Sequence, residues 1–199
     1  MKISLVSCGL QKFSQSSRVR EIFHQLILKR EKSIELYNLD LEKEKVPFWS
    51  NEKKNKTDFW GDKWTTISKN LSNSDGFIFV IPEYGGMASP NAKNFFLLCG
   101  NGELSHKPGL IVSISSGLGG AYPVMEIRSS SYKNTHIMWI PENIIIRHVE
   151  EFNPGDHGKN IPDWLDARIE YVLKLFLAYA SNMKPLREIV NRKDFGNGM

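Results

Sequence analysis

The sequence predicts a single α/β domain built on a doubly wound parallel sheet with helices on both faces. Its 199 residues are 41% hydrophobic and 24% charged, values typical of one globular domain. Short apolar runs rich in β-branched residues recur between turn residues, as expected of strands that are covered on both faces. Segments with helical spacing of apolar residues separate these runs. Five strands alternating with five helices therefore account for the chain, which shows no internal repeat and no linker.

Each element is predicted from its own local pattern. Apolar runs predict strands at residues 3–7, 33–38, 76–81, 109–115 and 144–148. Helical spacing predicts helices in the segments 19–27, 60–71, 120–131 and 165–180. A further helix is expected to begin at Pro90, because proline is favoured at the first helical position and Ser89 is a good N-cap.

Two segments do not fit this alternation. The polar stretch 43–55 contains a proline and two aromatic residues and is longer than most loops. It either forms one wall of a binding site or simply crosses the surface of the core, and the sequence favours neither. The chain after Pro185 is expected to fray. We therefore divide the chain into a domain over residues 1–186 and a C-terminal tail over residues 187–199.

Charge and motif content argue against several classes of function. Lys and Arg number 26 against 22 Asp and Glu, and the densest basic stretch is interleaved with glutamates, so no nucleic-acid-binding patch is predicted. The five histidines lack metal-ligand spacing, and no H-E-x-x-H motif occurs. A G-x-S-x-G motif is also absent from the sequence. We therefore expect neither a metal site nor a hydrolase.

Cysteine use and hydropathy indicate a cytoplasmic protein. Cys8 and Cys99 are too few for a disulfide framework, which fits a reducing compartment. The N-terminal apolar run lacks a signal-peptide core, and no stretch is long enough to span a membrane. Cys99 is expected to be buried, whereas Cys8 lies near the predicted site and either reacts with oxidants or packs as a buried thiol.

Ligands of parallel sheets bind at the carboxyl ends of the strands, so the loops after the first, third and fourth predicted strands are candidate sites. The first loop, residues 7–17, contains Ser14, Ser16 and Ser17 and leads directly into a helix. Hydroxyls and free amides at a helix N-terminus suit a phosphate, although ordinary capping explains one of these serines. The glycines of a nucleotide-triphosphate loop are absent.

The other two loops are rich in glycine. Residues 82–90 read P-E-Y-G-G-M-A-S-P, in which two glycines beside a tyrosine let the backbone approach a flat ligand. Residues 115–120 read S-S-G-L-G-G and again precede a helix. Either loop alone is weak evidence for a binding site, and it is their combination with the serine-rich loop that is informative.

In these motifs the sequence resembles the NADPH-dependent FMN reductases of the flavodoxin-like fold, which include quinone, chromate and azo-dye reductases. The similarity extends over residues 2–186. I-P-E-Y-G-G at residues 81–86 is similar to the family's T-P-E-Y-N-G, and residues 7–17 resemble its phosphate loop G-S-x-R-x-x-S-x-N/S. Residues 115–120 resemble the family's S-x-G-x-x-G-G loop, and residues 141–150 resemble its fifth strand.

Three positions depart from the family's motifs. Gln11 replaces the arginine of the phosphate loop, Cys8 stands where glycine is usual, and Gly85 replaces asparagine. The missing arginine bears on the strength of phosphate binding, because guanidinium groups are favoured partners of phosphate.

The resemblance implies a flavodoxin-like sheet with strand order 2-1-3-4-5. It also implies an enzyme in which hydride passes from NADPH or NADH to non-covalently bound FMN, and on to a quinone, azo compound, metal oxyanion or free flavin. No side chain is expected to act as a catalytic acid or base, and the backbone amides of residues 117–120 suit the negative charge on the flavin ring. The residues expected to bind the cofactor are Ser7, Gly9, Ser14, Ser16, Ser17, Pro82, Glu83, Tyr84, Gly85, Gly86, Ser115, Gly117, Gly119 and Gly120.

The resemblance further implies self-association as a dimer or a tetramer, for which Arg128 is a candidate interface ion-pair residue. The expected partner is otherwise a small-molecule oxidant, with no nucleic acid and no membrane. Two alternatives are a flavodoxin-like electron carrier and a flavin-binding interaction protein without turnover.

Overall fold

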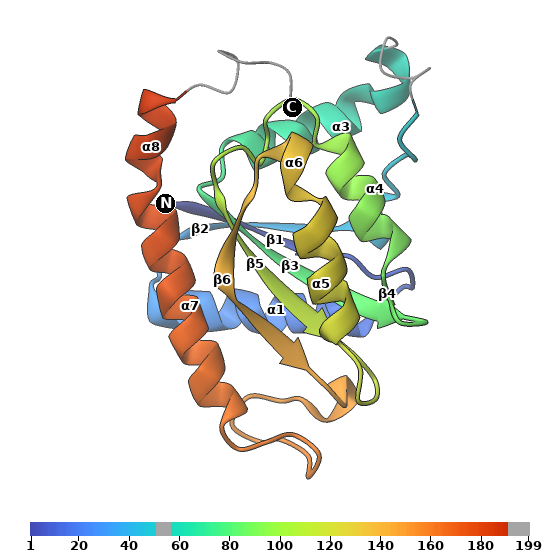
Figure 1. The fold of residues 1–199 in the computed structure, drawn as a ribbon, viewed down its shortest axis with the longest axis vertical. Helices are drawn as coiled ribbons and strands as arrows, with labels where there is room; N and C mark the ends of the chain where they lie inside the picture. The colour runs from blue at the N-terminus through green and yellow to red at the C-terminus, as the bar shows by residue number, and fades with distance from the viewer. Residues whose placement is uncertain (51–56, 191–199) are drawn as a thin grey trace.

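The parallel strands form one sheet in the order β2-β1-β3-β5-β6 (Figure 1). The computed structural model describes residues 1–50 and 57–190. The order of the parallel strands confirms the predicted flavodoxin-like sheet, and β4 adds a short antiparallel pair at the end of β3. The strands are β1 (Lys2–Ser7), β2 (Glu35–Asp40), β3 (Gly76–Tyr84), β4 (Met87–Ala88), β5 (Pro108–Ile114) and β6 (Met138–Ile146).

Helices cover both faces of the sheet (Figure 1). One face carries α1 (Gln15–Arg30) and α7 (Leu165–Asn182), and the other carries α3 (Thr57–Ser72), α4 (Pro90–Leu98) and α5 (Ala121–Ser130). Shorter helical segments are α2 (Leu41–Glu44), α6 (Tyr132–Thr135), α8 (Lys184–Ile189) and the 3-10 turn η2 (Val149–Glu151). No helix among these described elements has the length and apolar character needed to cross a membrane.

Strand β3 shows why the central strands are apolar at nearly every position. Phe77, Phe79 and Ile81 pack in the cluster that includes α3, α4 and α5, whereas Ile78 and Val80 pack with α1 and α7. All five side chains are fully buried. Because successive side chains of a strand point to opposite faces, a strand covered on both faces needs an unbroken apolar run.

Strand β6 begins earlier than the sequence predicts. It starts at Met138, whereas the apolar run begins at Ile144. Arg128 on α5 donates to the three carbonyls of residues 140–142 at 2.6–3.2 Å, close to a shift in the β5–β6 register. Because this contact joins a helix to a strand, the sequence of the strand alone gives no sign of it. Arg128 is thereby committed to contacts within the chain, and burial lowers its pKa.

The long connection after β2 lies against α4. Helix α2 occupies its start. Asn94 on α4 accepts a hydrogen bond from the Trp49 backbone N–H at 2.8 Å and donates its Nδ2 to the Pro47 carbonyl at 2.9 Å. Residues 51–55 of this connection lie outside the described residues. For residues 43–50, both alternatives stay predictions: one wall of a binding site, or a crossing over the surface of the core.

The chain continues as a helix beyond Pro185, where fraying was expected. Proline is tolerated in the first turn of a helix because its missing N–H has no intrahelical partner there. Arg187 of α8 forms an ion pair with Asp75, with Nη2 and Oδ1 2.7 Å apart. The predicted boundary at residue 186 therefore falls inside α8, and the expected tail includes residues 191–199, which lie outside the described residues.

Candidate functional site

The loops after β1, β3 and β5 meet at the carboxyl edge of the sheet. Ser7 at the end of β1 lies beside Asp40 of β2 and Val80 of β3. Ile114 at the end of β5 pairs with Pro82 on one side and with Ile146 of β6 on the other. The parallel register thus gathers the three predicted loops at one edge, which is where ligands of such sheets bind.

Hydrogen bonds fix the first loop against the second. Ser89 is the N-cap of α4, and its Oγ donates to the Cys8 carbonyl at 2.6 Å. Asn91 in the first turn of α4 donates its Nδ2 to the Gly9 carbonyl at 2.8 Å. The sequence predicts Ser89 as a cap but not the role of Asn91, because nothing local marks an amide that bonds to a loop about eighty residues away.

The first loop forms a cradle at the N-terminus of α1. Ser14 is the N-cap of α1, and its Oγ accepts the Ser17 backbone N–H at 3.3 Å. The Oγ of Ser16 is buried and has no hydrogen-bond partner within the described chain. A Cβ at Gly9 would collide with the Ser14 side chain and lie 3.2 Å from Ser16 Oγ. The glycine therefore lets the hydroxyls of Ser14 and Ser16 come close to the backbone of the first loop.

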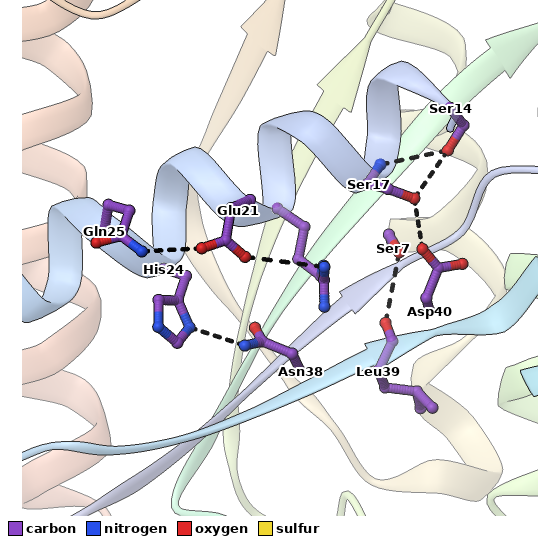
Figure 2. Close-up of polar contacts among 10 residues, drawn as sticks. Ser7, Ser14, Ser17, Glu21, His24, Gln25, Asn38, Leu39 and Asp40 are labelled. Carbon is purple, nitrogen blue, oxygen red and sulfur yellow. Dashed lines mark hydrogen bonds and ion pairs between the residues drawn. The ribbon is translucent and has the colours of Figure 1, made fainter. Parts of the chain in front are cut away.

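Two other predicted residues of the first loop, Ser7 and Ser17, face β2 (Figure 2). Ser7 is fully buried, and its Oγ lies 3.5 Å from the Leu39 carbonyl. Ser17 donates its Oγ hydrogen to Asp40 Oδ2 at 2.5 Å. Of the five first-loop residues predicted, the structure thus groups Gly9, Ser14 and Ser16 at the cradle, whereas the hydroxyls of Ser7 and Ser17 are directed elsewhere.

The second loop is a tight turn between β3 and β4. Tyr84 pairs with Met87 across it, and the two residues between them, Gly85 and Gly86, have φ values of +57° and +76°. Positive φ at both central residues is the hairpin turn that favours glycine. A Cβ at Gly86 would meet nothing within 4 Å, and one at Gly85 would meet only the tip of Met87. The backbone therefore borders open space, as predicted for a surface that accepts a flat ligand.

Neighbouring side chains of the second loop hold it to the rest of the domain. Pro82 is buried, and Glu83 and Tyr84 are half-buried. The Ala88 N–H donates to Glu126 Oε2 at 2.6 Å, and Glu126 also pairs with Lys93. Burial acts to raise the pKa of Glu126, but its bonds to Lys93 and Ala88 outweigh burial and lower it.

The third loop is packed more tightly than its glycine content suggests. A Cβ at Gly119 would collide with the Glu83 carboxylate, and one at Gly120, where φ is +105°, would collide with Ile145. These two glycines allow close packing within the protein, whereas a Cβ at Gly117 would meet nothing within 4 Å. Only Gly117 of the three borders open space in the way expected for all of them.

The amide groups of the third loop are partly used by the protein. Gly117 N donates to Ser115 Oγ at 3.3 Å, and Gly120 N donates to Glu83 Oε2 at 2.6 Å. No described group accepts a hydrogen bond from the amides of Leu118 and Gly119. The predicted set of donors at residues 117–120 is therefore reduced to these two.

The segment after β6 supports the third loop. Arg147 Nε donates to the Leu118 carbonyl at 2.6 Å and to the Gly119 carbonyl at 3.0 Å. Ser116 Oγ donates to Glu150 Oε1 at 2.9 Å. The sequence predicts a strand that ends at residue 148 and gives no sign of this supporting role, although the segment follows the carboxyl end of a strand like the other loops.

Both cysteines are buried thiols. Burial, followed by the nearby Asp40 carboxylate, raises the pKa of Cys8 far above its usual range. Burial likewise raises the pKa of Cys99. Of the two alternatives for Cys8, the structure supports packing, because the reactive form of a cysteine is the thiolate.

The chain is similar in sequence to a known protein family and similar in fold to solved structures. Residues 1–151 match the family model described as NADPH-dependent FMN reductase. Comparison with curated protein sequences gives no significant match.

Three solved structures illustrate the shared fold. An oxidoreductase from Corynebacterium diphtheriae is 13% identical, with a TM-score of 0.68 over 92% of this chain and 95% of that one. An NADH:FMN oxidoreductase, EmoB, in its apo form is 13% identical, with a TM-score of 0.67 over 88% of this chain and 87% of that one. The flavoenzyme NAD(P)H:(acceptor) oxidoreductase FerB from Paracoccus denitrificans is 14% identical, with a TM-score of 0.65 over 92% of this chain and 97% of that one.

At these identities the structural neighbours show the fold, and the family model supplies the relationship. The matched region runs from the first residue to the end of η2, so it includes all three loops of the site and the segment that supports the third. The chain therefore belongs to the NADPH-dependent FMN reductase family.

Proposed function

We propose that this chain binds FMN at the carboxyl edge of the sheet and, with NADPH or NADH as co-substrate, reduces a quinone, azo compound, metal oxyanion or free flavin. Family membership makes the chain an NAD(P)H-dependent flavin oxidoreductase. The observation that carries the proposal is the unpartnered, buried Ser16 hydroxyl at the Gly9 cradle, at the same edge of the sheet as a turn of two glycines that borders open space.

The phosphate of FMN fits the cradle chemically. A buried hydroxyl without a partner is costly, and an anion is an acceptor that would satisfy it. The N-terminus of α1 adds free amides and the positive end of the helix dipole. The phosphate would lie beside Gly9 and Ser14, and Ser16 would donate its hydroxyl hydrogen to it.

The isoalloxazine ring fits the space beside the second and third loops. The backbone at Gly85, Gly86 and Gly117 borders open space, so a flat ring can approach it without displacing side chains. The free amides of Leu118 and Gly119 would donate to the electron-rich edge of the ring. Glu83 holds the second and third loops together and so sets the width of the ring site.

Bound FMN would supply the redox chemistry, because it accepts a hydride from nicotinamide and passes electrons to the oxidant. The work left to the chain is to bind, orient and shield the two reactants. The carboxylate of Glu83 accepts the Gly120 N–H, and we assign it a positioning role, with no catalytic acid or base in the mechanism.

A groove beside the ring site offers room for a second molecule. It is lined by Gly86, Met87, Tyr122, Met125, Glu126 and Ser129, and the side chains of Met87, Tyr122 and Met125 are mostly exposed. We propose that a second copy of the chain covers part of this groove, in a dimer or a tetramer, because exposed apolar side chains gathered at one place are typical of interfaces. A cytoplasmic location remains part of the proposal.

The function is tested by purifying the protein, reconstituting it with FMN and following NADPH and NADH oxidation with a panel of quinones, azo dyes, metal oxyanions and free flavin. We expect a yellow protein whose oxidation of the nicotinamide depends on both flavin and acceptor. A yellow protein without turnover would instead indicate an electron carrier or interaction protein, and a protein that takes up no flavin would refute the proposal.

A further inference from the structure

Asp40 places a carboxylate next to the phosphate cradle. It is the last residue of β2 and pairs with Ser7, the last residue of β1 (Figure 2). Its Oδ1 accepts the backbone N–H groups of Glu42 at 3.2 Å and Lys43 at 3.3 Å, and so caps α2. Its Oδ2 accepts the Ser17 hydroxyl at 2.5 Å. The carboxylate therefore joins the start of α2 to the start of α1.

The direction of the hydrogen bonds follows from the chemistry of the groups. An ionised carboxylate has no hydrogen to donate, so Ser17 gives its one hydroxyl hydrogen to Asp40. The Oγ of Ser14 lies 3.1 Å from the Oγ of Ser17. Because the Ser17 hydrogen is committed, Ser14 must be the donor in this second bond. Asp40 thus draws the hydroxyl hydrogens of both serines away from an anion in the cradle.

The first loop keeps one cationic side chain, the exposed Lys12, and the other candidate cations near the phosphate are missing or bound elsewhere. The loop has Gln11 where the family's motif has arginine. Arg18, in the first turns of α1, donates to the carbonyls of Val149 and Phe152 and to Gln15, so its guanidinium is committed to the segment after β6 and to its own helix. Ser16, the helix amides and Lys12 are left as the donors to a phosphate.

We propose that Asp40 is a specificity-determining residue that weakens recognition of the flavin phosphate, so that the chain binds riboflavin within about tenfold as tightly as FMN. The inference rests on the proposed function and deepens it, since it assigns the ligand class as flavins with or without a phosphate. The bound flavin would then be exchangeable, because the Asp40 carboxylate weakens the contacts to the phosphate, which is the group that distinguishes FMN from riboflavin.

The test is the substitution Asp40→Asn, with FMN and riboflavin affinities measured separately by titration of flavin fluorescence. Asparagine is a good N-cap, so its Oδ1 can keep the two α2 amides. Its Nδ2 then takes the place of Oδ2 and donates to Ser17 Oγ, which frees the Ser17 and Ser14 hydrogens for the phosphate. We expect FMN affinity to rise at least tenfold and riboflavin affinity to change less than twofold.

We call the two bonds from Ser14 to Ser17 and from Ser17 to Asp40 the hydrogen-bond relay. Two further variants separate the effect of this relay from the effect of the negative charge alone. Glu42→Gln removes one negative charge from the neighbouring helix turn and leaves the Ser17–Asp40 contact, so FMN affinity should change less than threefold. In a Ser17→Ala background the relay is already cut, and the gain from Asp40→Asn should fall below threefold. If Asp40→Asn raised FMN affinity as much in the Ser17→Ala background as in the wild type, the relay would not explain the effect of Asp40. Asp40→Ser, which also caps without charge, serves if the asparagine variant fails to fold.

The outcomes of these measurements test the role of Asp40 and the proposed function separately. If the wild type binds FMN more than a hundredfold tighter than riboflavin, or if Asp40→Asn leaves their ratio unchanged, Asp40 does not set phosphate recognition while flavin binding stands. If neither wild type nor variants bind either flavin, the proposed function itself fails.

Discussion

Glu83 accepts a hydrogen bond from the backbone N–H of Gly120, with Oε2 and N 2.6 Å apart. The contact joins the end of β3 to the loop after β5, and the two residues lie 37 positions apart in the sequence. Gly119 lies so close to the same carboxylate that it has no room for a Cβ. The Glu83 carboxylate therefore holds these two segments, beside which the flavin ring would lie, against each other.

Replacing Glu83 tests this link. Glu83→Ala leaves the buried Gly120 N–H without an acceptor, and we expect the free energy of unfolding to fall by about 1–3 kcal/mol. Glu83→Gln keeps an oxygen acceptor and should lose clearly less. Urea unfolding followed by tryptophan fluorescence measures both variants. Equal losses would mean that the negative charge, rather than the acceptor, is what matters.

Ser16→Ala should weaken FMN binding without harming stability. The substitution removes a donor to the phosphate, and a hydrogen bond to a charged group contributes roughly 1.5–3 kcal/mol, which corresponds to tenfold or more in affinity. It also removes a buried hydroxyl that has no partner, so the melting temperature should stay the same or rise. Riboflavin affinity is the control and should not change. A parallel loss of riboflavin binding would place the phosphate elsewhere.

Gly85→Val should abolish most of the activity, whereas Tyr84→Phe should preserve it. The φ of +57° at Gly85 is strained for a β-branched residue by about 1–3 kcal/mol, and the new side chain would enter the space beside the ring. Tyr84→Phe loses at most one hydrogen bond, worth about 0.5–1.5 kcal/mol. Steady-state NADPH oxidation compares the two. An active Gly85→Val together with an inactive Tyr84→Phe would assign chemistry to the tyrosine hydroxyl.

Cys8 and Cys99 should resist thiol reagents in the native protein. Burial raises the pKa of both thiols, so almost no thiolate forms at pH 8. Titration with a chromogenic disulfide reagent should give almost no reaction under native conditions and two equivalents after unfolding. Rapid native labelling, if it mapped to Cys8, would show that the loop after β1 opens on the time scale of the assay.

Lys107 should make stability depend on pH at the opposite edge of the sheet. Burial first, and then the nearby Arg187, lower its pKa to about 8. Between that value and its ordinary pKa the unfolded chain binds the proton and the folded chain does not, so the free energy of unfolding rises with pH. The rise over this window is up to about 3 kcal/mol.

Comparison with Lys107→Met isolates this effect, because other titrating groups cancel between the two proteins. The stability difference, wild type minus variant, should increase from pH 8 to pH 10. The variant also leaves three carbonyls without their ammonium donor, which shifts its stability by a constant amount. A difference that stays flat over this range would show that those carbonyls keep Lys107 protonated in the folded state.

Local sequence patterns were enough to predict the alternation of strands and helices and to mark the loops of the candidate site. Unbroken apolar runs marked the central strands, because a strand covered on both faces tolerates few polar residues. Ser89 and Pro90 marked the start of α4, and the paired glycines 85 and 86 marked the turn after β3. These signals are local, because capping and turn geometry depend on residues a few positions apart.

Which of the predicted site residues can contact a ligand depends on contacts between distant parts of the chain. It left the Ser16 hydroxyl without a partner, gave the Ser17 hydroxyl to Asp40, and fitted Gly119 against Glu83. Asp40 follows the second predicted strand, so the carboxyl-edge rule that selected the other loops pointed to it as well. Its bond to Ser17, however, joins residues 23 positions apart. Such contacts arise when the sheet brings distant strand ends together, and the pattern of a single segment does not record them.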